Sequence, residues 1–202
     1  MKLYYSPGAC SLSPHIALEE AGLPYTIVRA STKTHKLEDG TDFYTINPLG
    51  YIPVLELADG SRLREGPAIV QYIADQVPQK NLAPASGTFA RYRLQEWLAF
   101  IGTELHKNFN PLFAPDTPDV YKPIVRDRLL ARLKWVDGEL KGKNYLMGDT
   151  FTVADGFLFT VASWPQYVGL DISAFTHLNA LRDRVAARPA VQAVLKAEGL
   201  IK

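Results

Sequence analysis

Residues 1–29 read MKLYYSPGACSLSPHIALEEAGLPYTIVR, and this stretch decides how the chain begins to fold. Lys2–Tyr5 is a short β-type run that ends at a Ser-Pro-Gly turn. Apolar residues then recur at helical spacing from about Ser11 to Ala21, and Gly22 offers a natural helix stop. Tyr25–Arg29 is again rich in β-formers. Because a helix separates the two strands, we expect them to pair in parallel as a βαβ unit.

The next patterned segment predicts an antiparallel hairpin followed by a helix. Pro53–Leu57 is β-rich, Asp59-Gly60 is a strong hairpin turn, and Ser61–Arg64 is the return strand. Gly66-Pro67 then opens a helix, with proline in the first turn, where its missing N–H costs nothing. Between the βαβ unit and the hairpin, we expect at most a short helix near Asp42–Ile46.

The pattern changes after Val77–Gly87, which holds two prolines and a glycine and has no periodicity. We expect residues 1–77 to form an α/β domain, residues 78–87 a linker and residues 88–202 an all-helical domain, with a last helix starting at Pro189. In the helical part, apolar residues recur at three- and four-residue spacing and predict two helical segments, the second over Pro118–Leu140. They are Phe89, Tyr92, Leu94, Trp97, Leu98, Ile101, Leu105 and Phe109, then Tyr121, Ile124, Val125, Leu129, Leu133, Val136 and Leu140.

Residues 151–156 also predict a helix start, because Thr152 and Asp155 match the Thr-x-x-acid spacing of a capping box. The accompanying hydrophobic staple is incomplete. Phe151 supplies its first member, but Gly156 stands at the position of the second. We therefore expect a weaker hydrophobic lock at this helix start, where a neighbouring side chain could fill the gap.

Composition excludes several classes of protein. The 202 residues carry 22 Lys and Arg against 21 Asp and Glu, so the net charge of +1 leaves no electrostatic footprint for nucleic acid or an anionic membrane. No apolar run approaches the roughly 18–20 residues of a membrane span. Pro7 and Gly8 interrupt the N-terminus before the apolar region of a secretory signal can form. We expect a cytoplasmic protein without a metal.

The lone cysteine, Cys10, stands where the first predicted helix begins. One cysteine makes neither an internal disulfide nor a cysteine-based zinc site, and Ser13 excludes a Cys-x-x-Cys dithiol. A thiolate at a helix start faces unpaired N–H groups and the positive end of the helix dipole, which lowers its pKa. The alternative is a buried structural cysteine, and both interpretations stay open at this point.

Two further segments suit a peptide-like ligand. In the turn-rich entry to Pro53–Leu57, the backbone of Ile52 would lie outside the sheet ladder and could pair with an extended peptide. At Glu65-Gly66, a carboxylate next to free helix N–H groups could hold the amino and carboxylate groups of one amino-acid head. The alternatives are an ordinary loop and an acid that only complements a helix dipole.

In their order and spacing, these segments resemble a known family. YSPGACSLSPHIALEEAG, NPLGYIPVLEL with its following Asp-Gly, and REGPAIVQYIAD resemble the thioredoxin-like half of a glutathione transferase. EWLAFIGTELHKNFNPLF and FTVADGFLF match the helical half. Cys10 followed by Ser-Leu-Ser resembles the bacterial beta class. The resemblance implies an α/β thioredoxin-like N-terminal domain plus an all-α C-terminal domain.

The resemblance also implies glutathione as co-substrate and a homodimer whose second subunit completes each site. Ile52, before a cis Pro53, would hold the cysteinyl part, and Glu65 with Gly66 the γ-glutamyl head. Relatives often have Ser at position 66, so one hydroxyl contact is absent here. One of Lys33, His35 and Lys36 would reach the glycyl carboxylate. The second-domain candidates are Ala99, where many relatives have Asn, and Thr103, Glu104, Leu105, His106 and Lys107.

The implied reaction is attack of the glutathione thiolate on a small hydrophobic electrophile, held in an apolar pocket near Phe109, Phe113 and Trp164. Cys10, His106 and Ser11 are the catalytic candidates, with the strand-end hydroxyl of Tyr5 a weaker rival of Ser11. Cys10 also allows thiol transfer or reductive dehalogenation through a mixed disulfide. The competing hypothesis is a non-catalytic glutathione-transferase-like module that binds protein partners. The retained ligand-holding residues favour an enzyme.

Overall fold

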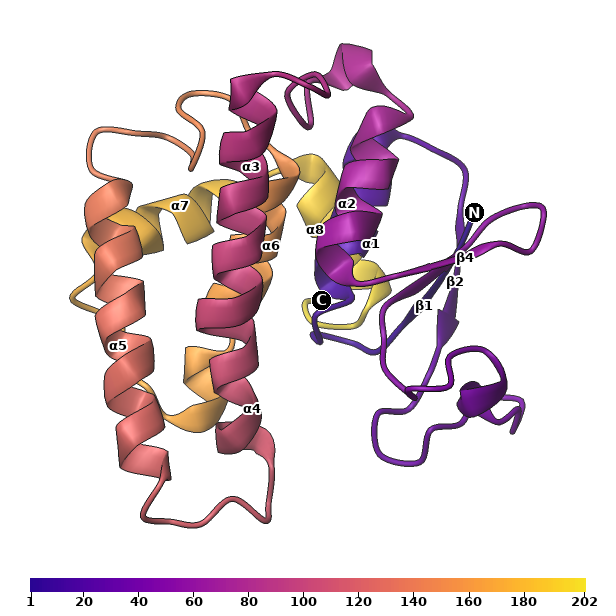
Figure 1. Ribbon diagram of the computed structural model, residues 1–202, viewed down its shortest axis with the longest axis horizontal. Helices are drawn as coiled ribbons and strands as arrows, with labels where there is room; N and C mark the ends of the chain where they lie inside the picture. The colour runs from indigo at the N-terminus through magenta and orange to yellow at the C-terminus, as the bar shows by residue number, and fades with distance from the viewer. The chain divides into compact units, whose positions relative to one another are not determined.

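The computed structural model describes residues 1–202 and divides the chain into two compact units (Figure 1). The first unit comprises Met1–Ala83 and Arg188–Lys202, and the second comprises Pro84–Ala187. The end of the chain therefore returns to the unit in which the chain began.

The first unit is built on a four-stranded mixed sheet. Its strands are β1 (Lys2–Tyr5), β2 (Thr26–Arg29), β3 (Val54–Glu56) and β4 (Arg62–Arg64), in the order β2-β1-β3-β4. β1 pairs with β2 in parallel, while β1 with β3 and β3 with β4 are antiparallel. The βαβ unit and the hairpin predicted from the sequence are therefore confirmed.

The turn of the β3–β4 hairpin forms as its sequence predicts. Gly60 has a φ of 83°, the left-handed region that a glycine enters without steric cost. The Asp59 carboxylate accepts the Ser61 N–H at 2.9 Å, and Leu57 N–H donates to the Ser61 carbonyl at 2.8 Å. These contacts fix the register that places Glu65 and Gly66 directly after β4.

Three α-helices and two 3-10 turns complete the first unit: α1 (Leu12–Ala21), η1 (Phe43–Thr45), α2 (Gly66–Asp75), η2 (Pro78–Lys80) and α8 (Pro189–Ala197). Gly22 caps α1 with a φ of 67°, as its position predicts. α1, α2 and α8 lie beside the sheet in Figure 1. The buried core of this unit includes Leu3, Ile16, Leu18, Leu55, Ile69 and Ile73.

Helix α8 packs against α1, although the sequence pattern groups it with the helices before it. Arg188, just before α8, makes a bidentate ion pair with Glu20 on α1, with N···O distances of 2.5 and 2.8 Å. Helical periodicity shows that α8 has an apolar face, but it does not show which neighbour that face covers. The domain limits drawn from the sequence stay a prediction.

The second unit is all-helical. It contains α3 (Phe89–Phe100), a π-helical segment η3 (Ile101–His106), α4 (Lys107–Phe113), α5 (Lys122–Glu139), α6 (Val153–Ala162), the 3-10 turn η4 (Pro165–Val168) and α7 (Thr176–Ala186). α3, η3 and α4 follow one another without a break. The π-helical hydrogen-bond register within this run has no counterpart in the sequence prediction.

The helices predicted from the apolar periodicity form, but the apolar positions are not buried along their whole length. Phe89 and Tyr92, the first members of the pattern, are 79% and 60% exposed. Tyr121 and Ile124 are exposed as well. Phe89, Tyr92 and Ile124 lie in the first turns of α3 and α5, and Tyr121 is the N-cap residue of α5. The remaining predicted positions are buried: Leu94, Trp97, Leu98, Ile101, Leu105, Phe109, Val125, Leu129, Leu133, Val136 and Leu140.

The cap predicted at Thr152 and Asp155 forms at the start of α6. The buried Asp155 carboxylate accepts the Thr152 N–H at 2.8 Å and hydroxyl at 2.9 Å, and the Leu146 N–H at 2.7 Å. Phe151 packs edge-on against Tyr145, with ring centroids 5.8 Å apart. Tyr145 thus provides the apolar partner that Gly156 does not.

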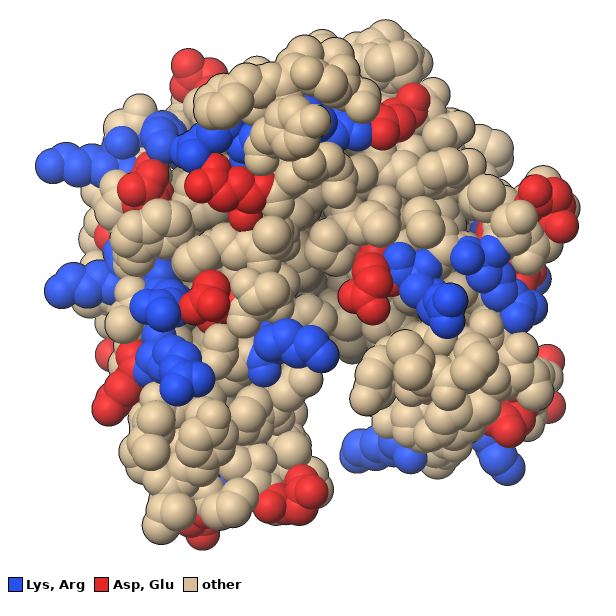
Figure 2. Space-filling view, viewed as in Figure 1, with Lys and Arg blue, Asp and Glu red and all other residues tan.

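The surface has mixed charge. On the face shown in Figure 2, Lys and Arg lie among Asp and Glu, with no large field of one sign. No helix has the combination of length and apolar character needed to cross a membrane.

Candidate functional site

Cys10 lies in the turn between β1 and α1, two residues before the helix begins, and is half-buried. Its thiol donates to the Ile52 carbonyl oxygen, with a sulfur–oxygen distance of 3.4 Å. Two candidate residues from distant parts of the sequence are thereby brought together. The position before α1 places the sulfur near the positive end of the helix dipole.

Ser11, the hydroxyl candidate of this turn, is fully buried. Its hydroxyl accepts the Ser6 N–H and donates to the Ser6 carbonyl, both at 3.1 Å. Both functions of this hydroxyl are therefore used to close the turn that carries Cys10. Tyr5, the weaker rival, is buried, and burial raises the pKa of its phenol.

The segment before β3 forms a turn braced from within. Asn47 is buried, and its side-chain amide donates to the Tyr51 carbonyl at 2.6 Å and accepts the Leu49 N–H at 3.2 Å. The Ile52–Pro53 peptide bond is cis, as expected. The turn ends with the Ile52 carbonyl facing the Cys10 thiol.

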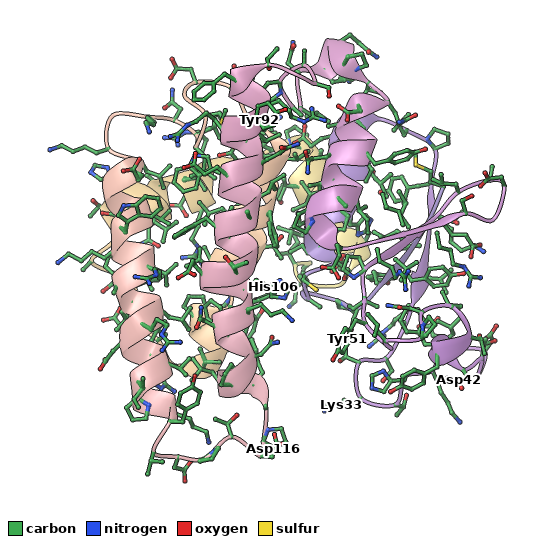
Figure 3. The ribbon with its side chains drawn as sticks, viewed as in Figure 1. Lys33, Asp42, Tyr51, Tyr92, His106 and Asp116 are labelled. Carbon is green, nitrogen blue, oxygen red and sulfur yellow. The ribbon has the colours of Figure 1, made fainter.

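The three candidates for the glycyl carboxylate lie in different surroundings. Lys33 and Lys36 are exposed, whereas His35 is half-buried. The His35 ring lies 4.9 Å from that of Tyr44, and its Nδ1 is 3.0 Å from the Gly50 carbonyl oxygen. Figure 3 shows Lys33, Asp42 and Tyr51 in this loop region of the first unit.

Glu65 stands at the N-cap of α2 with a φ of 67°, an uncommon conformation for a residue with a side chain. Its carboxylate is exposed and makes no capping hydrogen bond, so Glu65 does not have the ordinary capping role. Backbone strain of this kind clusters at ligand-binding sites. Beside it, a Cβ added to Gly66 would meet no atom within 4 Å.

The second-unit candidates occupy η3 and its borders. Thr103 is exposed, and its hydroxyl donates to the Ala99 carbonyl at 3.0 Å. Glu104 accepts the Arg132 Nε–H at 2.7 Å. Leu105 is fully buried, so its side chain belongs to the core of this unit. Lys107 and Ala99 are exposed. π-helical segments are rare and occur mostly at functional sites.

His106, at the end of η3, is enclosed by aromatic rings. Its ring centroid lies 6.0 Å from that of Phe157 and 5.1 Å from that of Trp164. Burial, with a smaller contribution from the charge of Lys107, lowers the pKa of His106 to about 4. The imidazole is therefore neutral at pH 7.

The aromatic residues expected near an electrophile form one cluster. Phe109 lies 6.2 Å from Phe113 and 5.5 Å from Trp164, centroid to centroid, and Phe113 lies 5.9 Å from Trp164. Phe109 and Trp164 are buried, whereas Phe113 is 48% exposed. The cluster thus has one apolar edge open to solvent.

Two domain models cover most of the chain. The N-terminal domain of glutathione S-transferases matches residues 8–76, and the C-terminal domain matches residues 100–189. Glutathione S-transferase GstA of Escherichia coli O157:H7 is 48% identical over 200 residues, covering 99% of this chain and 100% of its own. A sphingomonad glutathione S-transferase solved in complex with glutathione is 49% identical, with a TM-score of 0.95 over 100% of both chains. The bacterial beta-class enzyme of Sphingomonas chungbukensis is also 49% identical, with a TM-score of 0.96 over 100% of both chains.

The chain belongs to the glutathione S-transferase family. Its relatives and its Cys10 turn place it in the bacterial beta class. The architecture expected from the resemblance, a thioredoxin-like unit and a helical unit, is confirmed for this glutathione S-transferase.

No local sequence pattern indicates a buried pair that supports the Cys10 turn of this glutathione S-transferase. Glu198, after α8, accepts the Gly8 N–H at 2.8 Å through one carboxylate oxygen. Its other oxygen lies 2.8 Å from Nδ1 of His15 on α1. Both side chains are almost completely buried. Because these partners are separated by more than 180 residues, only the fold brings them together.

Two other contacts that hold candidate residues of this glutathione S-transferase are not among the sequence predictions. Arg132, on α5, pairs with Glu104, and Asn47 braces the turn before Ile52. The Arg132 contact joins two helices, and no spacing of residues along the chain indicates it. Asn47 does have a signal, since Asn before Pro-Leu-Gly favours a turn held by its own side chain.

Proposed function

We propose that this glutathione S-transferase conjugates the thiolate of glutathione to small hydrophobic electrophiles. The observation that carries the proposal is the meeting of the Cys10 thiol with the Ile52 carbonyl, 3.4 Å apart, in front of α1. The sphingomonad relative, solved with glutathione bound, supports this ligand.

In the proposed complex, glutathione lies along the edge formed by the turn before β3 and the start of α2. The backbone of Ile52 pairs with the cysteinyl part, as an added strand pairs with a sheet edge. The exposed Glu65 carboxylate binds the α-amino group, and the amide groups at the start of α2 bind the γ-glutamyl carboxylate. An exposed lysine, Lys33 or Lys36, binds the glycyl carboxylate.

The enzyme's chemical task is to hold the glutathione sulfur ionised. In the proposed reaction, the glutathione S–H loses its proton to solvent, the thiolate attacks an electrophilic carbon, and halide leaves with its bonding electrons. The dipole of α1 at Cys10 stabilises the anion. The ammonium of Lys107 adds positive charge, and the neutral imidazole of His106 donates a hydrogen bond.

We propose a cytoplasmic homodimer in which the second subunit supplies Ala99, Thr103, Glu104, Leu105, His106 and Lys107 to the site. The exposed edge of Phe113, backed by Phe109 and Trp164, offers an apolar surface for the electrophile.

Cys10 supports a second activity of the same site, glutathione-dependent thiol transfer. Its thiolate attacks a mixed disulfide between glutathione and a substrate thiol, the S–S bond breaks, and the substrate leaves as a thiolate. A second glutathione thiolate then attacks the Cys10–glutathione disulfide, which releases oxidised glutathione and restores Cys10. Intact-mass spectrometry after exposure to oxidised glutathione tests the first step. Cys10→Ala, which has no other thiol, is the control, and absence of a glutathione adduct on the native chain excludes the step.

Turnover of a chromogenic aryl halide, with Glu65→Gln as the test variant, checks conjugation. Gln keeps the size of Glu65 and the same backbone demand but loses the charge that binds the amino group. We expect KM for glutathione to rise about tenfold or more, because charge-assisted hydrogen bonds contribute roughly 1.5–3 kcal/mol. Glu38→Gln is the matched control. The Glu38 side chain is 75% exposed, and its ion pair with Arg29 is long, at 4.0 Å. Absence of turnover and of retention on immobilised glutathione in the native chain would favour a non-catalytic interaction module.

A further inference from the structure

We propose that His35 is a positioning residue for the glutathione site, acting through the Gly50 carbonyl on the turn that presents Ile52. The inference deepens the proposed function and rests on it for the identity of the ligand. The geometry itself is confined to the first unit. His35 thereby leaves the glycyl carboxylate to its lysine neighbours.

The contact between His35 and Gly50 defines which ring nitrogen carries the proton. Nδ1 lies 3.0 Å from the Gly50 carbonyl oxygen, and a carbonyl oxygen only accepts. The hydrogen-bond network therefore assigns the proton to Nδ1. In the neutral ring, Nε2 then carries a lone pair, which cannot donate to a carboxylate. The exposed ammonium groups of Lys33 and Lys36 are the donors suited to that task.

The approach of the His35 ring to the turn is close enough to require glycine. A Cβ at Gly50 would stand 2.9 Å from His35 Nδ1 and 2.7 Å from Cε1 of Tyr44. Gly50 also has a φ of 68°, the left-handed region. The Tyr44 ring packs against the His35 ring in a tilted arrangement at a centroid distance of 4.9 Å, so the imidazole is held between Tyr44 and the turn.

The backbone of His35 is fixed as firmly as its ring. Its φ is 51°, a conformation that costs energy for most residues with a side chain and persists where the surroundings enforce it. Its N–H donates to the Ser31 carbonyl at 3.0 Å, and its carbonyl accepts the Phe43 N–H at 2.8 Å. Phe43 is buried with Tyr4, Ala30 and Val54 in a small core under the loop. His35 is thus anchored to the body of the unit.

From Gly50 the connection continues to the ligand-facing backbone. Gly50 N–H donates to the Asn47 carbonyl at 2.8 Å, and the Asn47 amide holds the Tyr51 carbonyl. Ile52 follows, with its carbonyl 3.4 Å from the Cys10 sulfur. Asn47 braces the turn from inside and His35 from outside, so removing either leaves the Ile52 backbone free to shift.

Two isosteres separate this role from a direct contact with glutathione. In His35→Asn, the side-chain NH₂ replaces Nδ1–H, and Asn tolerates a left-handed φ. In His35→Gln, the NH₂ stands where Nε2 was. His35→Gly accepts the same backbone without any side chain. Thr34→Ala is the control, because the exposed Thr34 bonds only through its backbone N–H to Ser31.

We expect His35→Gln and His35→Gly to raise KM for glutathione by roughly 3–10-fold with kcat within about twofold, the effect of one lost hydrogen bond on ground-state binding. His35→Asn and Thr34→Ala should stay within about twofold of the native chain. Retention of KM in His35→Gln together with its loss in His35→Asn would overturn the proposal in favour of an Nε2 contact. Native values in all variants would also overturn it.

The tautomer can be measured without any ligand or variant. Long-range proton–nitrogen NMR on the native chain should show His35 protonated at Nδ1 in its neutral form. Protonation at Nε2 would contradict the assignment. Because this readout needs no glutathione, it separates failure of the inference from failure of the proposed function.

Discussion

At the scale of single residues, Gly66 departs from the family pattern, and the structure shows whether a larger side chain would fit there. Many relatives place Ser there, and the structure leaves the position open. Its neighbour Glu65 keeps an exposed carboxylate on a strained backbone. The proposed glutathione site therefore keeps the backbone groups of Glu65 and Gly66 but has no side-chain hydroxyl at position 66.

Gly66→Ser should tighten glutathione binding. The added Cβ meets no atom within 4 Å, and Gly66 does not have a positive φ, so the change introduces no strain. One new hydrogen bond contributes about 0.5–1.5 kcal/mol, which corresponds to roughly 2–10-fold lower KM. Steady-state kinetics with varied glutathione measure it. Gly66→Ala is the control, and equal improvement there would show that the hydroxyl makes no contact.

His106 should titrate far below an ordinary histidine. Burial among Phe157 and Trp164 lowers its pKa from 6.5 to about 4. NMR titration of the ring, assigned by comparison with His106→Gln, should give a midpoint near 4. A midpoint at 6 or above would mean that the ring is solvated or paired with an anion.

The same shift makes stability depend on pH. Because the folded chain binds this proton more weakly than the unfolded chain, stability is fully present above about pH 6.5 and falls as the pH drops toward 4. Between pH 7 and 4.5, the native chain should lose about 2 kcal/mol more than His106→Gln in urea unfolding. Parallel losses in the two proteins would refute the burial of the neutral ring.

The sequence indicates the role of a residue where its immediate neighbours in the chain define its chemistry. Cys10 at a helix start, Glu65 before a helix and Ile52 before Pro53 all carry local signals. His35 does not, since a histidine between two lysines resembles a solvated surface. Its contact with Gly50 depends on the path of the loop, which no spacing rule specifies.

At the scale of elements, turn residues and caps set most boundaries. Gly22, Asp59-Gly60 and the Thr152–Asp155 cap act where the sequence predicts. The π-helical segment Ile101–His106 was not predictable, because periodicity marks a buried face and does not reveal a shift of hydrogen-bond register. The exposed Phe89 and Tyr92 show the same limit, since amphipathicity does not show where the covering element ends.

The α6 cap should be the most sensitive single element. Asp155 accepts two backbone N–H groups and a hydroxyl, although burial raises the pKa of its carboxyl to about 6. Asp155→Ala leaves the buried Leu146 and Thr152 N–H groups unpaired, at about 1–3 kcal/mol each. We expect urea unfolding to show a loss of roughly 2–5 kcal/mol. Asp149→Ala, an exposed aspartate of the same loop, is the control, and a comparable loss there would argue against the cap.

At the scale of the whole molecule, the sequence predicts an α/β part followed by an all-helical part. The structure adds that the last helix belongs to the first unit. The Cys10 turn is held by Glu198, so the end of the chain supports the site at its beginning. Such long-range pairing of polar residues has no periodic signature. Family resemblance, rather than local pattern, is what connects the two units to one function.

The proposed dimer has a direct test. Sedimentation equilibrium at micromolar concentration should give twice the chain mass of 22.5 kDa. A monomer with full activity would remove the second subunit from the proposed site.

The pKa of the thiol of bound glutathione tests the central claim most directly. Ultraviolet difference absorption of the thiolate, followed against pH in the presence of saturating glutathione, measures it on the native chain. We predict a midpoint at least about one unit below the value near 8.5 of a free thiol, because α1 and Lys107 stabilise the anion. A midpoint unchanged from free glutathione, or no binding signal at all, would contradict the account.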